Sequence, residues 1–359
     1  MFEGFRYIPS LGVRPSEIEG LRRLPDFDKD ALFPDIRLKK WHNSGSLDKS
    51  FNAISEAFGS RPSILDLGPA PLEIKSQCDA RLMQLRDPNN GHADWVSLIA
   101  EHEQFVPTLQ WGGTASQTRL QAEQLLSLNR GLVIKLRRQH QWDLASLASL
   151  HGLNTASSEV LIVLEYGQLA SQTDLTAASA ELAGIAQSVV GVFSFSVLRF
   201  TLAVTSFPAE FASINREHAR LPIRERGLFA ILSAAPIFSS GQVVLIYGDM
   251  ASVCADRGEF ARGGAPRIDL ACRNEWAYYR REHDQSYVAA ANAVMADSAW
   301  QDGLYIWGTN EIRRAASGDL SDLAYPRRWV TVRINVHLHQ QLHYSAPGQV
   351  LQTDEPWND

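Results

Sequence analysis

The sequence is poor in cysteine, and its three cysteines are not spaced for a zinc site. Cys78, Cys254 and Cys272 are odd in number, and no two of them form a C-x-x-C motif. This pattern argues against both the disulfide framework of a small secreted domain and the thiolate pairs of a zinc knuckle. The cysteines therefore predict free thiols in a reducing compartment, and we expect a cytoplasmic protein.

Long apolar runs and an excess of basic residues are also missing. The first residues, MFEGFRYIPSLGV, lack the basic stretch and apolar core of a secretory signal, and Arg199 and several hydroxyl side chains interrupt the apolar stretch 189–204. A transmembrane helix needs roughly 18 or more apolar residues in a row. The formal net charge of -6, from 34 basic and 40 acidic residues, gives no overall attraction to polyanions. We expect no membrane insertion and no general nucleic-acid binding.

The sequence contains none of the short motifs that identify a common catalytic or cofactor site. A Walker A loop, a G-x-S-x-G elbow, an H-E-x-x-H helix and an EF-hand loop are all absent. The cofactor therefore stays unknown at this stage, and a divalent metal held by carboxylates is one alternative. Function has to be argued from where the fold places charged residues.

Eight short β-like runs, separated by helical patterns, are the main feature that the sequence does contain. Runs such as GLVIKLR and EVLIVLEY are apolar on both faces, which is typical of parallel strands covered by helices. An open doubly wound sheet alternates in the same way, but no G-x-G-x-x-G follows the first run, and the eighth run ends near residue 250, the usual size of a barrel. We therefore predict an α/β fold, a (β/α)8 TIM-like barrel. The runs are Arg6–Leu11, Leu32–Leu38, Ser63–Leu67, Phe105–Trp111, Gly131–Arg137, Glu159–Tyr166, one within Phe195–Phe207, and Ser240–Asp249.

The character of the chain changes after Asp249. The residues that follow are too many for a tail, and they include a helical pattern at Tyr287–Met295 and an alternating apolar pattern at Trp329–Asn335, which predicts a strand. We expect residues 1–250 to form the barrel, 251–344 an α+β cap or extension packed on it, and 345–359 a polar tail.

Charged side chains interrupt the apolar runs near their carboxyl ends, where barrels place functional groups. Lys135 and Arg137 share one face of the fifth run, Arg37 lies on the second, Glu165 near the end of the sixth, and Asp249 at the end of the eighth. Cations could bind phosphate, and the carboxylates could hold a metal or act as acid and base. The alternative is that these charges only form structural ion pairs. The functional interpretation requires Lys135, Glu165 and Asp249 to meet in one open cavity.

The C-terminal part offers further candidates. If Trp329–Asn335 continues as a strand, Asn335, His337 and His339 point to one face, and two histidines at this spacing could bind a metal. Hydrogen-bonded structural histidines are the other interpretation, and no metal ligand is assigned. Trp276 and Arg280 could form a stacking wall for a base, whereas a buried aromatic cluster is the alternative.

Five short motifs resemble the beta-protein family, which is associated with T-even phage. They are YIPSL at Tyr7–Leu11, YGD at Tyr247–Asp249, Trp276-x-x-Tyr279-Arg280, Trp307-Gly308 followed by Ile312, and Asn335-x-His337-Leu338. Val336 departs from the family pattern, in which many relatives have another histidine at this position. The resemblance implies a single barrel-like module with no assigned biochemical activity, found among genes of mobile elements and phage defence.

Two functions are consistent with these features. The first is a phage-conflict or mobile-element-associated barrel protein that acts as an enzyme on a phosphate-containing small molecule or nucleotide at the carboxyl ends of its strands. The second is a non-catalytic sensor of an anti-phage defence system that binds a partner protein, and the sequence does not decide between them. The candidate catalytic residues are Glu165, Asp249 and His337, and the candidate ligand-binding residues are Arg37, Lys135, Arg137, Tyr247, Trp276, Arg280 and Asn335.

Overall fold

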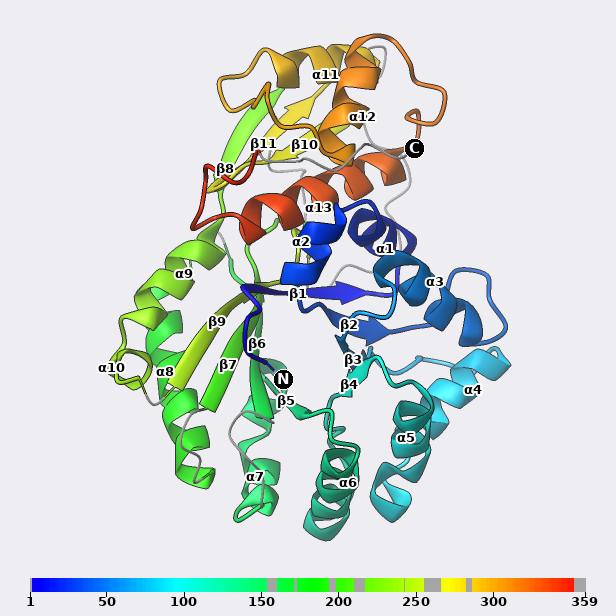
Figure 1. Cartoon of the computed structure of the whole chain (residues 1–359), viewed down its shortest axis with the longest axis vertical. Helices are drawn as coiled ribbons and strands as arrows, with labels where there is room; N and C mark the ends of the chain where they lie inside the picture. Colours follow the sequence, from blue (N-terminus) through cyan, green and yellow to red (C-terminus); the bar gives the residue numbers. More distant parts are fainter. Residues whose placement is uncertain are drawn as a thin grey trace.

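Eight parallel strands form a nearly closed barrel in the computed structural model (Figure 1). The structure describes residues 2–153, 160–170, 173–193, 198–209, 217–241, 243–254, 266–281 and 286–351. The hydrogen-bonded strand order is β4-β3-β2-β1-β9-β7-β6-β5, and a parallel bridge between Thr108 and Val133 joins the two outer strands, with Leu109 N 2.8 Å from Val133 O. The barrel strands are β1 (Tyr7–Gly12), β2 (Asp35–Leu38), β3 (Ser63–Leu67), β4 (Phe105–Pro107), β5 (Leu132–Arg137), β6 (Val160–Gln168), β7 (Leu198–Thr205) and β9 (Val243–Asp249).

This sheet is consistent with the predicted TIM-like barrel. Each of the eight predicted β runs contains most or all of one barrel strand, although residues 159, 195–197 and 242 of those runs lie outside the described part of the chain. An open doubly wound sheet would leave two distant edges, whereas here β4 and β5 meet. The expected alternation of strands and helices is therefore confirmed as a mixed α/β architecture.

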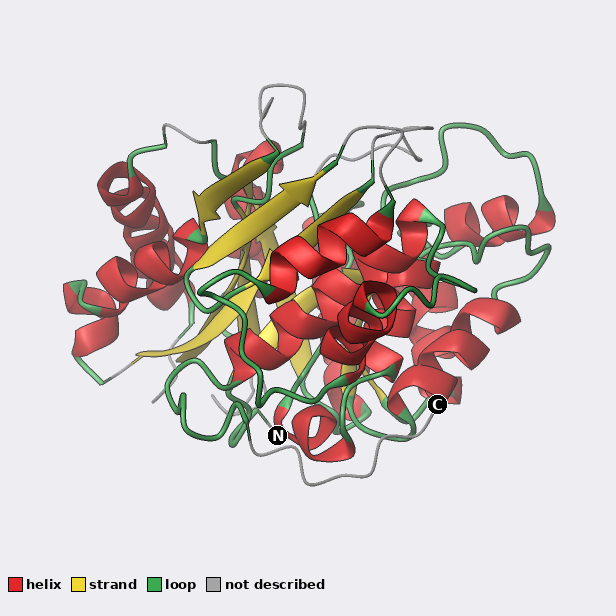
Figure 2. Ribbon diagram, turned by 90° about the horizontal axis from the view of Figure 1, so that it is seen from above, coloured by secondary structure: helices red, strands yellow, loops and turns green. Residues whose placement is uncertain are grey.

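Helices follow the barrel strands and cover the outside of the sheet, so that the strands lie between helices when viewed from above (Figure 2). In α3, Phe51, Ile54 and Phe58 recur at helical spacing and are buried, as the sequence pattern predicts. The helices of this part are α1 (Pro15–Arg22), α2 (Asp26–Ala31), α3 (Asp48–Phe58), α4 (Gln77–Gln84), α5 (Asn89–Glu101), α6 (Ala115–Ser127), α7 (Leu144–Leu147) between the short 3-10 turns Arg138–Asp143 and Ala148–Leu150, α8 (Leu175–Val192), α9 (Arg224–Ser233) and α10 (Pro236–Ser239).

Helix α8 is long and apolar enough to cross a membrane by length and composition, a test that core helices of soluble proteins also pass. Its residues Leu182, Ala186 and Val189 pack in the same hydrophobic cluster as the outward faces of the barrel strands. One face of this helix therefore packs on the barrel, although only 28% of its apolar window is buried.

Side chains of the barrel strands divide cleanly between the lumen and the helix layer. Ile64, Val133, Leu161, Val163 and Ile246 pack together in the lumen. Their sequence neighbours pack against the surrounding helices in a larger cluster. Because side chains alternate along a strand, this division fixes which later residues of each strand point into the barrel.

A second, smaller sheet forms a cap over one side of the barrel. Its strands are antiparallel in the order β10-β11-β8, and β8 comes from the segment between β7 and α9. A separate hydrophobic core, which includes Trp276, Ile268 and Trp307, lies between this sheet and its helices. The cap elements are β8 (His218–Pro222), β10 (Arg267–Ala271), β11 (Glu275–Arg280), α11 (Tyr287–Met295) and α12 (Trp307–Ala316).

The last helix, α13 (Pro326–Leu342), joins the cap to the barrel (Figure 1). Its residues Ile334 and Leu338 pack in a cluster with Tyr7 and Tyr247 on the outward faces of β1 and β9, whereas Val336 packs in the cap core. The helix contacts α1 on one side, and its Gln341 accepts a hydrogen bond of 2.8 Å from Arg226 of α9. This is the position that the eighth helix takes in a (β/α)8 barrel.

The prediction of a strand at Trp329–Asn335 is wrong, because these residues lie within α13. The segment alternates apolar and polar residues, but the helix is buried on nearly all sides, so no 3.6-residue apolar stripe marks it. The prediction of a helix at Tyr287–Met295 is confirmed. The expected polar tail, 345–359, is described only as far as residue 351.

Candidate functional site

A pocket of about 470 Å³ opens at the carboxyl ends of β2 to β6. It lies at the end of the barrel where such folds hold their ligands, and the loops after β3, β4 and β5 form its walls. The lining residues are Arg37, Asp66, Leu67, Gly68, Pro69, Ala70, Arg86, His92, Gln110, Trp111, Arg137, Gln139, His140 and Glu165.

The floor of this pocket is a fully buried ion-pair cluster in the lumen. Lys135 Nζ lies 2.7 Å from Asp35 Oδ1 and 2.9 Å from Asp66 Oδ2, and none of these three side chains is more than 1% exposed. Ser10 donates a hydrogen bond of 2.8 Å to the other oxygen of Asp35. A buried charge is tolerated only when it is paired and hydrogen-bonded, so Lys135 is held in place by the two carboxylates.

A second layer of charges lies above this floor and faces the pocket. Arg137 Nη2 is 3.0 Å from Asp66 Oδ2, and Glu165 Oε2 lies 3.2 Å from Arg37 Nη2 and 3.7 Å from Arg137 Nε. Arg37 Nη2 and Glu165 Oε2 are ion-paired, yet neither atom forms a well-aligned hydrogen bond with any described residue. Both atoms are buried, so they are directed at each other, and a ligand in the pocket would contact other atoms of these side chains.

The carboxylate of Asp66 is a permanent anion in this setting. Burial alone would raise its pKa, but Lys135 and Arg137 outweigh burial and hold the pKa well below its ordinary value. Asp66 is thus a charge partner and not a proton donor near neutral pH. The pocket is lined by three guanidinium groups, those of Arg37, Arg86 and Arg137, and by two carboxylates, those of Asp66 and Glu165. The lining therefore carries a net positive charge.

Two strained turns border the pocket. Asn90, Gly91 and His92 have φ angles of 51°, 69° and 55°, and residues 141–143 have φ angles of 52°, 60° and 50°. Such left-handed conformations are costly for residues other than glycine and cluster at functional sites. The first turn places His92 in the pocket wall, and the second follows His140, another wall residue. Burial lowers the pKa of His92, which favours the neutral imidazole.

Asp249 lies in a different, closed cluster. It accepts hydrogen bonds from the hydroxyl of Tyr7, from Tyr247 at 2.8 Å and from the Ala251 backbone N–H at 2.8 Å, and His337 Nε2 is 2.9 Å away. Burial alone would raise the pKa of Asp249, but His337 and the hydrogen-bond donors lower it below its ordinary value. Burial and the charge of Asp249 raise the pKa of both tyrosines, so they remain donors.

The expectation that Asp249 shares a cavity with Lys135 and Glu165 is wrong. Ile246 points into the lumen, so Gly248 also points inward, and Tyr247 and Asp249 face outward onto α13. A Cβ on Gly248 would lie 2.3 Å from Thr201 Oγ1, which explains a glycine in the YGD motif. The strand period identified residues that share a face but not which face is inside.

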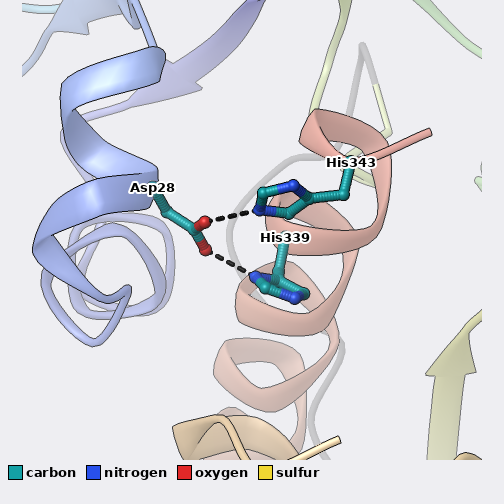
Figure 3. Close-up of side chains that lie close together, drawn as sticks. All are labelled: Asp28, His339 and His343. Atoms are coloured by element: carbon teal, nitrogen blue, oxygen red, sulfur yellow. Dashed lines mark hydrogen bonds and ion pairs between the residues drawn. The ribbon is translucent and has the colours of Figure 1, made fainter. Parts of the chain in front are cut away.

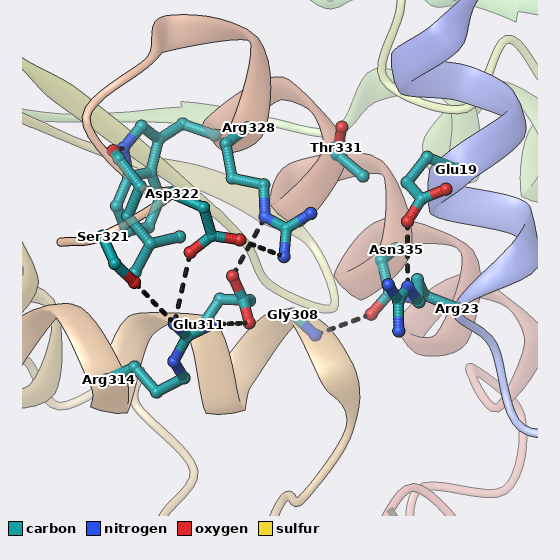
Figure 4. A network of polar contacts seen from close by, with 12 residues as sticks. Glu19, Arg23, Gly308, Glu311, Arg314, Ser321, Asp322, Arg328, Thr331 and Asn335 are labelled. Atoms are coloured by element: carbon teal, nitrogen blue, oxygen red, sulfur yellow. Dashed lines mark hydrogen bonds and ion pairs between the residues drawn. The ribbon is translucent and has the colours of Figure 1, made fainter. Parts of the chain in front are cut away.

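The cap candidates do not reach the pocket either. Trp276 is fully buried and stacks on His337, with ring centroids 6.2 Å apart, so it belongs to the core between cap and barrel. Arg280 ends β11 and pairs with Arg267 in the cap sheet. Asn335 accepts a hydrogen bond of 2.9 Å from Gly308 N and donates one of 3.1 Å to Gly20 O, which ties α13 to α12 and α1 (Figure 4).

The structure thus divides the ten candidate residues into two groups and two outliers. The first group meets at the pocket and consists of Arg37, Lys135, Arg137 and Glu165. The second group meets between β9 and α13 and consists of Tyr247, Asp249, Trp276 and His337. The two outliers are Asn335 and Arg280. Arg86, His92, His140 and Trp111 were not among the candidates, although they line the pocket. The Asn90-Gly91 pair was an available signal, because it favours a left-handed turn.

Comparison with known proteins gives one consistent relationship. The family model described as Beta protein matches residues 7–343. "Protein beta" of Enterobacteria phage P4 is 27% identical over 357 residues, which cover 97% of this chain and 96% of the relative. No solved structure matches. The relative comes from phage P4, whereas the sequence motifs had suggested T-even phage. The family model spans nearly all of the chain, and the chain belongs to the beta protein family.

Proposed function

We propose that this protein binds a small phosphate-bearing molecule, such as a nucleotide, at the carboxyl-terminal mouth of its barrel, and that it serves in phage or mobile-element conflict. The net positive lining of the pocket is the observation that carries the proposal. The phage relative supports the biological setting but says nothing about a ligand. In this proposal the barrel is a TIM-like (β/α)8 barrel whose cap leaves the β2–β6 half of the mouth open.

Arginine is the residue best suited to this ligand class. A guanidinium group donates two parallel hydrogen bonds to a phosphate and stays charged at any physiological pH. Arg37 and Arg137 are held by Glu165 and Asp66, so they are oriented before a ligand arrives. The indole of Trp111 lines the same pocket and is fixed by a hydrogen bond of 2.7 Å to Lys135 O, so a base could stack beside the phosphate.

The test is a thermal-shift panel of inorganic phosphate, sugar phosphates and nucleotides, with the unphosphorylated nucleosides as controls. A ligand that binds only the folded protein raises the midpoint by mass action. We expect stabilisation by at least one phosphorylated compound and none by its nucleoside. Arg37→Gln and Arg137→Gln should lose that shift. Arg138→Gln, a change to the exposed arginine that follows Arg137 and pairs with Glu181 outside the pocket, should keep it. The proposal would be contradicted if the phosphorylated compounds stabilised the wild type and the three variants equally, or if they did not stabilise the wild type.

A second function, that of a sensor without turnover, is favoured by the ion pairs of the barrel lumen. The cations there, Lys135, Arg137 and Arg37, are each paired with a carboxylate of Asp35, Asp66 or Glu165. Phosphorus NMR of the bound ligand after incubation separates the two. New phosphorus signals that disappear in Glu165→Gln, with binding retained, indicate an enzyme in which Glu165 moves a proton. An unchanged ligand indicates a sensor.

A further inference from the structure

Three side chains from distant parts of the chain converge between α2 and α13 (Figure 3). His339 Nδ1 lies 2.5 Å from one oxygen of Asp28, and His343 Nε2 lies 2.7 Å from the other. His339 lies in the last turn of α13 and His343 is the residue that caps its C-terminus, four positions later, so both rings point toward the carboxylate. The three potential ligand atoms all lie within 4.8 Å of one another.

From these contacts we infer that Asp28, His339 and His343 bind a divalent transition-metal ion of the zinc class. Two imidazole nitrogens and one carboxylate oxygen are a ligand set that such ions accept, with a further position left for water. The site is separate from the barrel pocket and does not depend on the proposed function.

The charge of Asp28 requires a cation at this place. The side chain is fully buried, and its ion pairs within the described residues are with the two imidazoles. An isolated buried carboxylate is strongly unfavourable, and a metal ion held between Asp28 and the two imidazoles would supply a compensating positive charge.

The surroundings of His339 suit a metal-binding histidine. Its second nitrogen, Nε2, lies 2.7 Å from the carbonyl oxygen of Val350, which can only accept a hydrogen bond. The Asp28 carboxylate at Nδ1 is the other contact of the ring. With a metal on Nδ1, Nε2–H donates to the carbonyl, the arrangement by which proteins commonly orient a metal-binding histidine.

The contact distances define what the site must do to accept the ion. Ligands about 2.0–2.2 Å from a tetrahedral ion are separated from one another by roughly 3 Å or more. The present nitrogen–oxygen distances, 2.5 and 2.7 Å, are hydrogen-bond lengths. At these bond lengths tetrahedral ligands lie roughly 3.3–3.6 Å apart, so Asp28 has to withdraw by about 0.6–1.1 Å. It lies on α2, a helix of only six residues.

The experiment is a titration of the chelator-treated full-length chain with Co²⁺, followed by visible absorption and by elemental analysis after dialysis. We expect one equivalent per chain, the absorption of a four-coordinate ion, a thermal midpoint raised by several degrees, and displacement of Co²⁺ by Zn²⁺. Asp28→Asn and His343→Gln should lose the bound equivalent, and His151→Ala, which removes an exposed histidine, should retain it.

The wild-type titration decides the matter even if the variants fold poorly. If the folded wild-type protein binds no stoichiometric Co²⁺ or Zn²⁺, the cluster is held by protons alone and the inference is overturned. Binding that persists at full stoichiometry in folded His343→Gln would place the ion elsewhere and would also overturn it.

Discussion

Glu225 is a buried carboxyl group whose side-chain hydrogen bonds, among the described residues, come from Ser206 and not from a lysine or arginine. It accepts hydrogen bonds of 2.6 Å from both the backbone N–H and the hydroxyl of Ser206. Burial raises the pKa of Glu225 to about 7, opposed by Ser206 and assisted by the negative charge of Asp249. The folded protein therefore holds a proton on Glu225 in a pH range where the unfolded chain has released it.

The sign of the resulting pH dependence follows from this difference. The folded state binds more protons than the unfolded state between the ordinary pKa of 4.5 and about 7, so the contribution of Glu225 to stability is full below 4.5 and is lost as the pH rises to about 7. In Glu225→Gln this loss is absent. Relative to wild type, the variant should gain about 3 kcal/mol in unfolding free energy from pH 4.5 to pH 8.

Urea unfolding of both proteins across this range measures the difference. Glu56→Gln, a change to an exposed carboxylate on α3, is the matched control and should show a constant difference from wild type. A pH-independent difference for Glu225→Gln would mean that Glu225 is ionised in the folded protein throughout.

At the residue scale, the sequence identified part of the charged cluster that the structure places at the pocket. Lys135, Arg137 and Glu165 stood out because charges are rare in strands so apolar, and the register of β5 and β6 brings them together. Asp249 stood out for the same reason, yet it faces away. Period-two alternation cannot tell the lumen from the helix layer when both are apolar, since that distinction depends on the closure of the barrel.

At the scale of elements, α13 depends on polar contacts as much as on apolar ones. Asn335 is fully buried, and its amide satisfies the N–H of Gly308 and the carbonyl of Gly20 on two neighbouring helices (Figure 4). In Asn335→Ala both backbone groups lose their partner without access to water. Each unsatisfied buried group costs about 1–3 kcal/mol, so the variant should lose about 2–6 kcal/mol of unfolding free energy.

Thr331→Ala on the same helix is the matched control. Thr331 is also buried, but among the described residues its hydroxyl donates to Arg327 O, one turn earlier in α13, and to no other element. Its replacement should cost less than about 1.5 kcal/mol in denaturant unfolding. Similar losses in the two variants would show that the contacts of Asn335 with α1 and α12 are not what stabilises the helix.

The burial of α13 on nearly all sides also explains why its sequence pattern predicted a strand. Helices such as α3 have one apolar stripe and are recognised by it, whereas α13 is covered by α1, α9, α12 and the cap sheet. Its apolar and polar residues then both point inward, and the alternation in WVTVRIN resembled a strand. The proline at its first position, Pro326, was the available signal of a helix start.

At the scale of the whole molecule, the chain leaves the barrel after β9, builds most of the cap, and returns as α13 to cover the barrel. The order of elements was predictable from local patterns, but the return was not, because it depends on contacts between residues more than 240 positions apart, such as Tyr7 with Asp249 and Asn335 with Gly20. Since α13 packs on both the barrel and the cap, we expect the stability of each to depend on this helix.

A chain that ends at residue 254 should consequently not fold into a stable monomer. Without α13, the outward faces of β1 and β9 lose their cover, which exposes Tyr7, Leu11 and Tyr247, and Asp249 loses His337. Each large apolar side chain loses roughly 1.5–3 kcal/mol of burial, and the sum is comparable to the 5–15 kcal/mol that stabilises a typical domain. Size-exclusion chromatography and circular dichroism should find aggregate or unfolded chain, whereas a control ending at residue 351 should behave as wild type. A soluble truncated chain that unfolds cooperatively would show that the barrel closes without its last helix.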